Sequence, residues 1–303
     1  SCCPSPGTVT GPGAISLSYY NTPRFNWKDG KCQGLLIEDT RTNLFTYSIP
    51  TPGSNGWGTD TAGTPTPNDT VAPDGTTTGT LITQTNEYKV KRNITIVQDD
   101  TYTLSGFIKP STQCTNFTLA SSNYGEFFAM NFDTTKTGID GDGVVKDPSS
   151  QPCTGTMDKS YADGWIRISM TYTYTGTQGA NGNQQIRCSD AVSGTWYVWG
   201  AQFEEGVFPT SYIPTSGAEA TRSEDICGVS GDSFSEFYND LEGTMVFEGL
   251  IPAEPQEQFL VSIGGVSNSK FMSLLKLQTN DMKIECRINT GGAQYGKEGP
   301  RVS

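Results

Sequence analysis

The sequence predicts an all-β protein built from antiparallel sheets, and three observations support this fold class. Several short segments alternate apolar and polar residues with a period of two, while helical periodicity is nearly absent. The chain holds 35 Gly and 17 Pro, which punctuate these segments as turn residues do between strands. Aromatic residues make up 11% of the chain, too many for a disordered polar segment. The pattern is typical of a two-sheet sandwich.

The expected strands follow one another through the middle of the chain. In residues 164–176, Ile166, Ile168 and Met170 fall on one face, while polar residues occupy the other. The remaining candidates show the same alternation and are residues 87–98, 101–110, 115–122, 127–133, 183–191 and 195–206. Each of these strands is therefore expected to bury one face.

The composition divides the chain into four expected regions. Residues 1–31 are rich in Pro and Gly and are predicted to form an irregular arm, followed by the sandwich over 32–227 and a linker over 228–242. Alternation restarts at Gly243, which predicts a second β domain over 243–303. Its expected strands are residues 243–252, 258–265, 270–278 and 281–289. An independent sandwich has about 100 residues, so we expect further chain or partner subunits to complete this domain.

The charge and hydropathy exclude several classes of partner. The net charge is −12 and the pI is about 4.5, which argues against nucleic acid or an anionic membrane as partner. No apolar run approaches the roughly 18 residues of a membrane span. The first residue is Ser1 rather than Met, as in a processed, trimmed or partial chain.

The residue types also exclude most catalytic machinery. The chain contains no His, so a Ser-His triad is excluded, and it lacks the glycine-rich phosphate loop and the dinucleotide fingerprint. Paired carboxylates are the remaining catalytic option, but the adjacent Glu204 and Glu205 would point to opposite faces of a strand. We therefore expect no enzymatic activity.

Cysteine and acidic residues give weak metal signals. The 8 Cys are scattered without a C-x-x-C pair, and zinc is disfavoured because no His is present. The sequence permits either disulfide bonds or free buried thiols for these cysteines. Asp140 and Asp142 would share a face in an extended Asp-Gly-Asp-Gly segment, and oxygen ligands at this spacing suit a structural calcium ion. An ordinary turn is the more common role of such a segment, and no other cofactor is indicated.

Two aromatic residues in turn-rich segments are candidate sugar-stacking platforms. Trp57 lies in "SNGWGTD" and Tyr124 lies in "SNYGE". The alternative, which we favour, is that each ring anchors its loop to the sandwich. The other aromatics of interest, Trp165, Trp196 and Trp199, lie in expected strands and are predicted to be core residues.

Several stretches occur together in one order and carry a family resemblance. They are "CQGLLIEDTRTNLFTYS" (32–48), "VAPDGTTTGTLIT" (71–83), "TYTLSGFIKP" (101–110), "DGWIRISMTYTYTG" (163–176) and "YVWGAQFEEGVFPTSYIPTSGAEATRSED" (197–225). The set resembles phage and prophage virion proteins, namely tail fibres, tailspikes and head-decorating proteins. It covers residues 32–226, and Phe203 and Val207 depart mildly from the Leu and Ser that the family usually carries.

The resemblance implies a fold, a location and partners. The fold is a carbohydrate-binding-module-like jelly roll over 32–227, followed by the start of a concanavalin- or laminin-G-like sandwich. The implied protein is a non-enzymatic virion-surface component of the tail-fibre or tailspike type, a homo-oligomer (a trimer), which contacts other virion proteins and host-surface glycan. A capsid-decoration or head-fibre protein is the alternative. A depolymerase is disfavoured because no short β-helix repeat is visible, and a secreted bacterial carbohydrate-binding protein is the fourth interpretation.

The resemblance also assigns roles to individual residues. Four polar residues at motif positions are expected to fasten the closure of the jelly roll rather than to do chemistry: Arg41, Asn43, Glu205 and Arg222. In a jelly roll the strands at 115–122 and 183–191 should be antiparallel neighbours. This arrangement could bring Cys114 close to Cys188, and we predict a disulfide between them.

Overall fold

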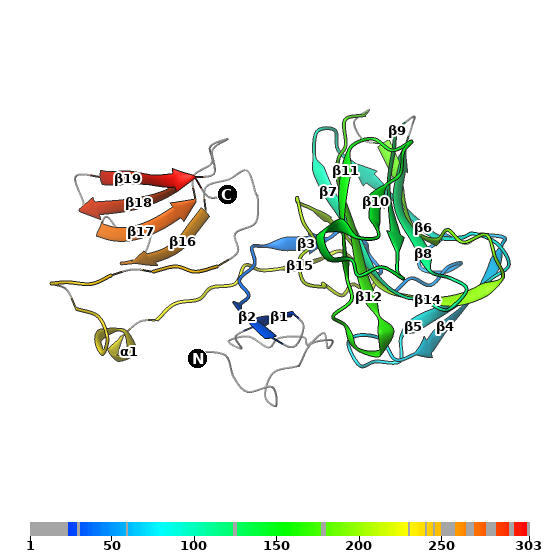
Figure 1. Ribbon diagram of the computed structural model, residues 1–303, viewed down its shortest axis with the longest axis horizontal. Helices are drawn as coiled ribbons and strands as arrows, with labels where there is room; N and C mark the ends of the chain where they lie inside the picture. Colours follow the sequence, from blue (N-terminus) through cyan, green and yellow to red (C-terminus); the bar gives the residue numbers. More distant parts are fainter. Residues whose placement is uncertain are drawn as a thin grey trace. The chain divides into compact units, whose positions relative to one another are not determined.

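A computed structural model shows the architecture of the chain in two separate parts (Figure 1). It describes residues 24–28, 31–58, 60–123, 126–176, 180–229, 231–239, 241–244, 246–249, 258–264, 270–276, 283–290 and 294–301. The chain divides into two compact units, Ser1–Cys227 and Gly228–Ser303.

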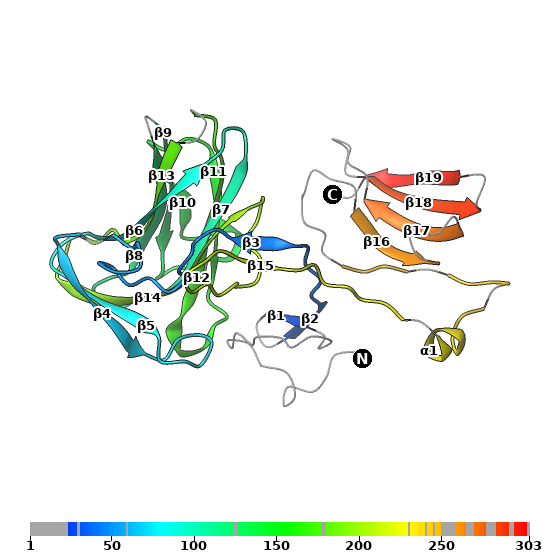
Figure 2. The ribbon, with the colours of Figure 1, turned by 180° about the vertical axis from the view of Figure 1, so that it is seen from behind.

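The first unit is an antiparallel jelly-roll sandwich of two large sheets (Figures 1 and 2). One sheet has five strands in the order β10-β9-β8-β13-β6, and the other has six in the order β11-β12-β7-β14-β5-β4. The bounds are β4 (Gly63–Thr70), β5 (Gly79–Gln84), β6 (Tyr88–Ile96), β7 (Thr101–Lys109), β8 (Asn116–Asn123), β9 (Glu126–Asp133), β10 (Val144–Lys146), β11 (Cys153–Asp158), β12 (Ile166–Thr173), β13 (Ala180–Cys188) and β14 (Gly194–Glu205). The predicted all-β antiparallel fold class is confirmed.

Each of the seven strand segments expected between residues 87 and 206 contains a strand, but four other strands of the sandwich were not expected. These four are β4, β5, β10 and β11. Both β4 and β11 are edge strands, and β4 contains two prolines, which an edge tolerates because its N–H groups need no partner. Edge strands bury too little apolar surface to show a clear alternation.

The main core lies between the two sheets, and a second apolar cluster covers the outer face of the six-stranded sheet. In β7, Leu104 and Ile108 face the main core, whereas Phe107 belongs to the second cluster with Trp165 and Trp199. All three predicted core tryptophans are at most 1% exposed, and Trp196 lies in the main core. The central strands β7 and β14 of the six-stranded sheet are therefore buried along both faces, whereas the edge strands β4 and β11 are largely exposed.

Short strands complete the first unit at its chain entry and exit. The hairpin of β1 (Phe25–Lys28) and β2 (Lys31–Leu35) precedes β3 (Arg41–Asn43), and β3 pairs with β15 (Ala220–Arg222). The expectation of an irregular arm over 1–31 is therefore wrong for residues 25–28 and for Lys31, which lie in strands. The alternating sequence of residues 25–28, Phe-Asn-Trp-Lys, is amphipathic but too short to stand out among turn residues. Residues 1–23 lie outside the described part of the chain.

The second unit contains a four-stranded antiparallel sheet in sequence order. Its elements are α1 (Asp232–Ser235), β16 (Gln258–Ile263), β17 (Lys270–Lys276), β18 (Lys283–Thr290) and β19 (Gln294–Arg301). The predicted strand over 243–252 is wrong for the residues described there, 243, 244 and 246–249, which form no strand. Alternation alone does not make a strand, because the backbone also needs a partner for its hydrogen bonds. Among the described residues, no helix has the length and apolar character of a membrane span.

Cys114 and Cys188 meet in the structure, but as free thiols. Strands β8 and β13 are antiparallel neighbours as expected, with Cys188 opposite Phe117. Both cysteines are fully buried, and their side chains hydrogen-bond to each other. The predicted disulfide is therefore wrong here, because the pair is accommodated as a thiol contact within the core. Cys32, in contrast, is disulfide-bonded.

The thiols are predicted to differ strongly in reactivity. Burial raises the pKa of Cys114 and of Cys188, whereas Cys227 is exposed and free. In the native protein, iodoacetamide should therefore alkylate Cys227 first, and both buried thiols only after unfolding. Peptide mapping by mass spectrometry with and without urea measures this order. Alkylation of Cys188 in native protein at the rate of Cys227 would contradict it.

Candidate ligand-binding site and motif closure

The two longest motif segments, residues 32–48 and 197–225, lie together and close the first unit. We call this region the motif closure. Backbone hydrogen bonds join them, from Leu44 N to Phe203 O at 2.8 Å and from Asp225 N to Glu38 O at 2.8 Å. The β3–β15 ladder lies between these contacts along the leader. Segments that are far apart in sequence are thus parts of one structural element.

Asn43 is the polar centre of the closure and is completely buried. Its side-chain Nδ2 donates to the carbonyl of Ile213 at 2.9 Å. Its Oδ1 accepts from the backbone N–H groups of Phe45 at 3.1 Å and Phe203 at 3.2 Å. One amide therefore connects the leader, strand β14 and the exit segment, and it satisfies backbone groups that burial would otherwise leave unpaired.

The buried acid of the closure is Glu204, not the predicted Glu205. Glu204 is fully buried and accepts hydrogen bonds from Thr210 N at 2.9 Å and from Thr210 Oγ1 at 2.6 Å, while Glu205 is exposed. The β14–β7 register shifts between Trp199 and Gln202. A bulge of this kind moves the following residues to the opposite face. Without the bulge, strict alternation would have placed Glu205, and not Glu204, on the same face of the sheet as Trp199.

A charged cluster ties the outer end of the closure together. Arg222 Nη1 and Arg24 Nη1 lie 3.1 Å and 2.7 Å from Glu38 Oε2, and the backbone N–H of Ser211 donates to Glu38 Oε1 at 2.8 Å. Arg24 also pairs with Asp225. Burial acts to raise the pKa of Glu38, but the charge of Arg222 and the hydrogen bonds outweigh it, so the pKa is lowered. Of these residues, Arg222 was predicted as a fastener from the motif, whereas Glu38 and Arg24 were not.

Arg41 packs against the turn that follows β14. Its guanidinium carbon lies 5.5 Å from the centre of the Phe208 ring. A Cβ atom at Gly206 would lie 2.9 Å from Arg41 Nε, and Gly206 has φ +147°. Glycine is therefore required at position 206 to make room for this guanidinium. Arg41 thus packs against the closure, in a structural role.

Trp57, a candidate sugar platform, is a loop anchor, which is the role that the sequence analysis favoured. It is only 3% exposed, its indole N–H donates to Tyr47 O at 3.0 Å, and the Arg92 guanidinium lies 5.5 Å from its ring. The platform interpretation is therefore wrong for Trp57, because no ring face is open to a ligand. Tyr124 lies outside the described residues.

The Asp-Gly-Asp-Gly segment forms a turn. Asp140 belongs to the short 3-10 helix Ile139–Gly141, and the carboxylate of Asp142 accepts from Thr137 N at 3.1 Å and Thr137 Oγ1 at 3.0 Å. Within the described ranges, no group of three or more His, Cys, Asp or Glu residues is placed to hold a metal ion. Structural calcium at this turn stays a prediction.

The outer face of the five-stranded sheet presents a polar row. The register aligns one residue from each strand across the sheet, namely the polar Lys89, Arg187, Thr118 and Asn131 and, at the β10 edge, the apolar Val145. The next residues along the same strands face the main core. This face differs from the outer face of the six-stranded sheet, which an apolar cluster covers.

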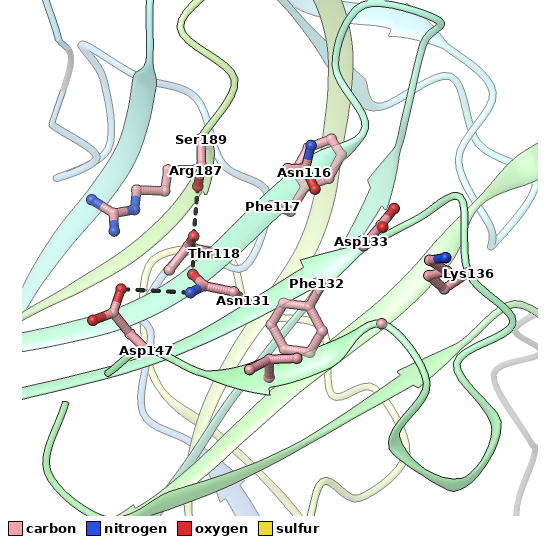
Figure 3. Close-up of a pocket in the computed structure, with 12 residues that line it drawn as sticks. Asn116, Phe117, Thr118, Asn131, Phe132, Asp133, Lys136, Asp147, Arg187 and Ser189 are labelled. Carbon is pink, nitrogen blue, oxygen red and sulfur yellow. Dashed lines mark hydrogen bonds between the residues drawn. The ribbon is translucent and has the colours of Figure 1, made fainter. Parts of the chain in front are cut away.

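A hollow of about 550 Å³ opens along this row, and all of the row's residues except Lys89 line it (Figure 3). Its lining comes from β8, β9, β10, β13 and adjoining loops, and comprises Asn116, Phe117, Thr118, Asn131, Phe132, Asp133, Lys136, Gly143, Val145, Asp147, Arg187 and Ser189. Most of these residues carry hydrogen-bonding groups. The hollow is therefore a candidate site for a polar ligand.

A chain of hydrogen bonds orders the polar wall of the hollow (Figure 3). Thr118 Oγ1 lies 2.5 Å from Ser189 Oγ and donates to Asn131 Oδ1 at 2.7 Å. Asn131 Nδ2 donates to Asp147 Oδ2 at 3.5 Å. These contacts fix the Thr118 and Asn131 side chains before a ligand arrives, which reduces the entropy cost of binding.

Both carboxylates of the hollow are held in the ionised form. Hydrogen bonds from Ser149 lower the pKa of Asp147, with a further contribution from the charge of Arg187. Hydrogen bonds from Thr135 and the charges of Lys136 and Lys159 lower the pKa of Asp133. At neutral pH the hollow thus offers carboxylate acceptors beside the cationic donors Arg187 and Lys136.

This arrangement suits binding more than catalysis. Carboxylate, amide and guanidinium groups side by side can accept from and donate to neighbouring hydroxyl groups. The polar residues of the lining carry no sequence signal of a site, because each lies at an ordinary outward position of a strand or in a turn. The one available signal was the alternation itself, which marks Arg187 and Asn131 as positions opposite to core residues.

Asn43→Ala is predicted to destabilise the first unit by about 3 kcal/mol, because several buried backbone groups lose their partner. Urea unfolding followed by Trp fluorescence measures this, since all 5 Trp lie before residue 228. Asn93→Ala is the matched control, because Asn93 is exposed, and it should change stability by less than about 0.5 kcal/mol. Equal effects of the two variants would contradict the role given to Asn43.

Glu38→Gln is predicted to destabilise the unit by about 1.5–3 kcal/mol at neutral pH, because charged hydrogen bonds are lost. The lowered pKa of Glu38 means that its contribution is present above its usual pKa of 4.5 and is lost as pH falls. The stability difference from wild type should therefore shrink in urea titrations below pH 4.5. The exposed Glu219→Gln variant should show no such pH-dependent difference, and a constant gap for Glu38→Gln would refute the assignment.

Comparisons with known proteins found structural similarity only. No protein-family model and no curated protein matches the chain. A family 16 carbohydrate-binding module is similar at 11% identity and a TM-score of 0.35, over 53% of this chain and 99% of its own. A xylan-binding domain from Paenibacillus barcinonensis is similar at 11% identity and a TM-score of 0.34, over 57% of this chain and 99% of its own. A Clostridium thermocellum xylanase fragment complexed with xylohexaose is similar at 15% identity and a TM-score of 0.34, over 59% of this chain and 30% of its own.

Proposed function

We propose that the chain is a non-enzymatic surface component of a phage virion, of the tail-fibre or tailspike type, that binds host-surface glycan through the hollow on its five-stranded sheet. Its partners are then host saccharide and neighbouring virion proteins, and it assembles as a homo-oligomer. The virion assignment depends on the sequence resemblance over residues 32–226.

The observation that carries the glycan-binding part is the open polar face with its pre-ordered hollow. In the hydrogen-bonded chain Ser189–Thr118–Asn131–Asp147, the buried Thr118 holds its two neighbours in place. The partly exposed Ser189, Asn131 and Asp147 present hydroxyl, amide and carboxylate groups on one wall. Arg187 adds a guanidinium that pairs with Glu87 at 3.1 Å. Sugars bind through such clusters of fixed donors and acceptors, and shallow sites of this kind bind weakly.

The positions of the motif residues support a structural use of the motifs. Asn43, Glu204 and Arg222 all make hydrogen bonds or ion pairs within the closure. None of these three residues lines the hollow. Residues of the family motif thus build the scaffold, while binding is left to residues outside the motif.

A capsid-decoration or head-fibre protein is the second candidate, and exposed apolar residues beside the closure favour it. Leu35 is 42% exposed, Ile37 is 56% exposed and Ile226 is 90% exposed. Ile37 and Ile226 adjoin the hydrogen bond between Asp225 and Glu38. Exposed apolar residues gathered at one place are typical of protein contact surfaces. If the chain is a capsid-decoration or head-fibre protein, its main contacts are made to other virion proteins and not to glycan.

Arg187→Ala and Asn131→Ala are predicted to weaken saccharide binding about fivefold to tenfold each, because each removes at least one hydrogen bond worth about 1 kcal/mol. The measurement is a glycan array followed by calorimetric titration of the saccharide that binds best. Asn93→Ala is the matched control, on the same sheet face but outside the hollow, and should bind like wild type.

The outcomes separate the two candidates. Binding that is lost in both hollow variants and kept in Asn93→Ala supports the glycan-binding role. Absence of saccharide binding, together with fitting of the chain onto the shell in a map of the particle, would replace it with the decoration role. Shortening of host polysaccharide by the purified protein would contradict the non-enzymatic assignment.

A further inference from the structure

We infer that the hollow takes an uncharged saccharide segment, one that offers neighbouring hydroxyl groups and carries no carboxylate, sulfate or phosphate. This inference rests on the proposed glycan-binding function and narrows it to a class of ligand. Two properties of the lining support it: its charges balance, and each of its cations already lies beside an acidic group.

The charged groups of the lining sum to zero. Asp133 and Asp147 are carboxylates, and Lys136 and Arg187 are cations. Both carboxylates are ionised at neutral pH because their pKa values are lowered. The hollow therefore has no excess of positive charge, which a site for an anionic ligand would need.

The two cations already lie beside acidic groups. Arg187 Nη1 is 3.1 Å from Glu87 Oε1, and the Arg187 side chain is only 17% exposed. Lys136 lies near Asp133 and Asp142, where its charge lowers both pKa values. An anion that approached either cation would also approach carboxylates, and this repulsion would offset much of the attraction.

A hydroxyl group fits this mixture better than an anion does. A sugar hydroxyl can donate to a carboxylate and accept from a guanidinium, an ammonium or an amide. A ligand carboxylate or sulfate can only accept, so it would leave Asp133 and Asp147 without a donor from the ligand. The alternation of donors and acceptors around the hollow matches a row of hydroxyl groups.

The net charge of the whole chain also disfavours an anionic ligand. The net charge is −12, so a polyanionic polysaccharide is repelled at long range in low salt. An uncharged polysaccharide feels no such repulsion, and its affinity should depend little on ionic strength. Salt dependence therefore distinguishes the two ligand classes.

The test compares neutral polysaccharides with charged derivatives of the same backbone. Dextran, mannan and galactomannan are titrated into the full chain beside their carboxymethylated and sulfated forms, at about 20 mM and about 300 mM salt. We expect at least one neutral polymer to bind, with less than about a twofold change between salt concentrations. Its charged derivatives should bind about tenfold more weakly or worse, and most weakly at low salt.

A charge variant gives a second, independent readout. The double variant Asp133→Asn with Asp147→Asn removes both carboxylates of the lining and keeps its two cations, while Glu87 and Asp142 outside the lining stay in place. It should gain affinity for sulfated polymer at least about fivefold at low salt, which corresponds to about 1 kcal/mol. Glu219→Gln is the matched control, since Glu219 is exposed and does not line the hollow, and it should leave that affinity unchanged.

Each outcome has a definite meaning. Tighter binding of a carboxymethylated or sulfated polymer by wild type, weakened by salt and lost in Arg187→Ala, would overturn this inference while supporting the proposed function. Absence of binding to every neutral and charged polymer would overturn the proposed function and the inference with it. Neutral binding that Arg187→Ala leaves intact would place the sugar site elsewhere.

Discussion

The buried amide of Asn43 is the contact on which the rest of the first unit depends. It joins the leader to strand β14 and to the exit segment by hydrogen bonds to Phe45, Phe203 and Ile213. A polar group at 0% exposure is stable only if its partners are all in place. The amide therefore requires one specific arrangement of the two chain ends, and Glu204 and Glu38 extend the same arrangement outward.

This closure also decides which sheet is available to a ligand. The exit segment brings Tyr212 onto Trp199, with ring centres 4.5 Å apart, and the cluster around them covers the six-stranded sheet. The five-stranded sheet keeps its outer polar row and the hollow. The polar groups of the closure make their hydrogen bonds inside the protein, whereas the five-stranded sheet presents polar groups to solvent. Binding and closure thus use different residues of the same sandwich.

The sequence was sufficient for the architecture but not for the site. Period-two alternation located the central strands because they bury a full apolar face, as Ile166, Ile168 and Met170 do. The motif position Glu205, which the family resemblance supplied, is not the buried acid of the closure, because a bulge after Trp199 reverses the faces of the strand and buries Glu204 instead. Two roles were open for Trp57 from the sequence, a sugar platform and the favoured loop anchor, because only the fold shows that Arg92 and Phe45 pack against its ring. The hollow brings together turns and strands distant in sequence, which only the fold can show.

The most direct test of this account is a map of backbone amide chemical shifts during titration of isotope-labelled protein with a neutral oligosaccharide. The account predicts saturable shifts at Thr118, Asn131, Asp147 and Arg187, with little change at Asn43 or Glu204. Shifts centred on the closure, or on the outer face of the six-stranded sheet around Tyr197, would contradict it.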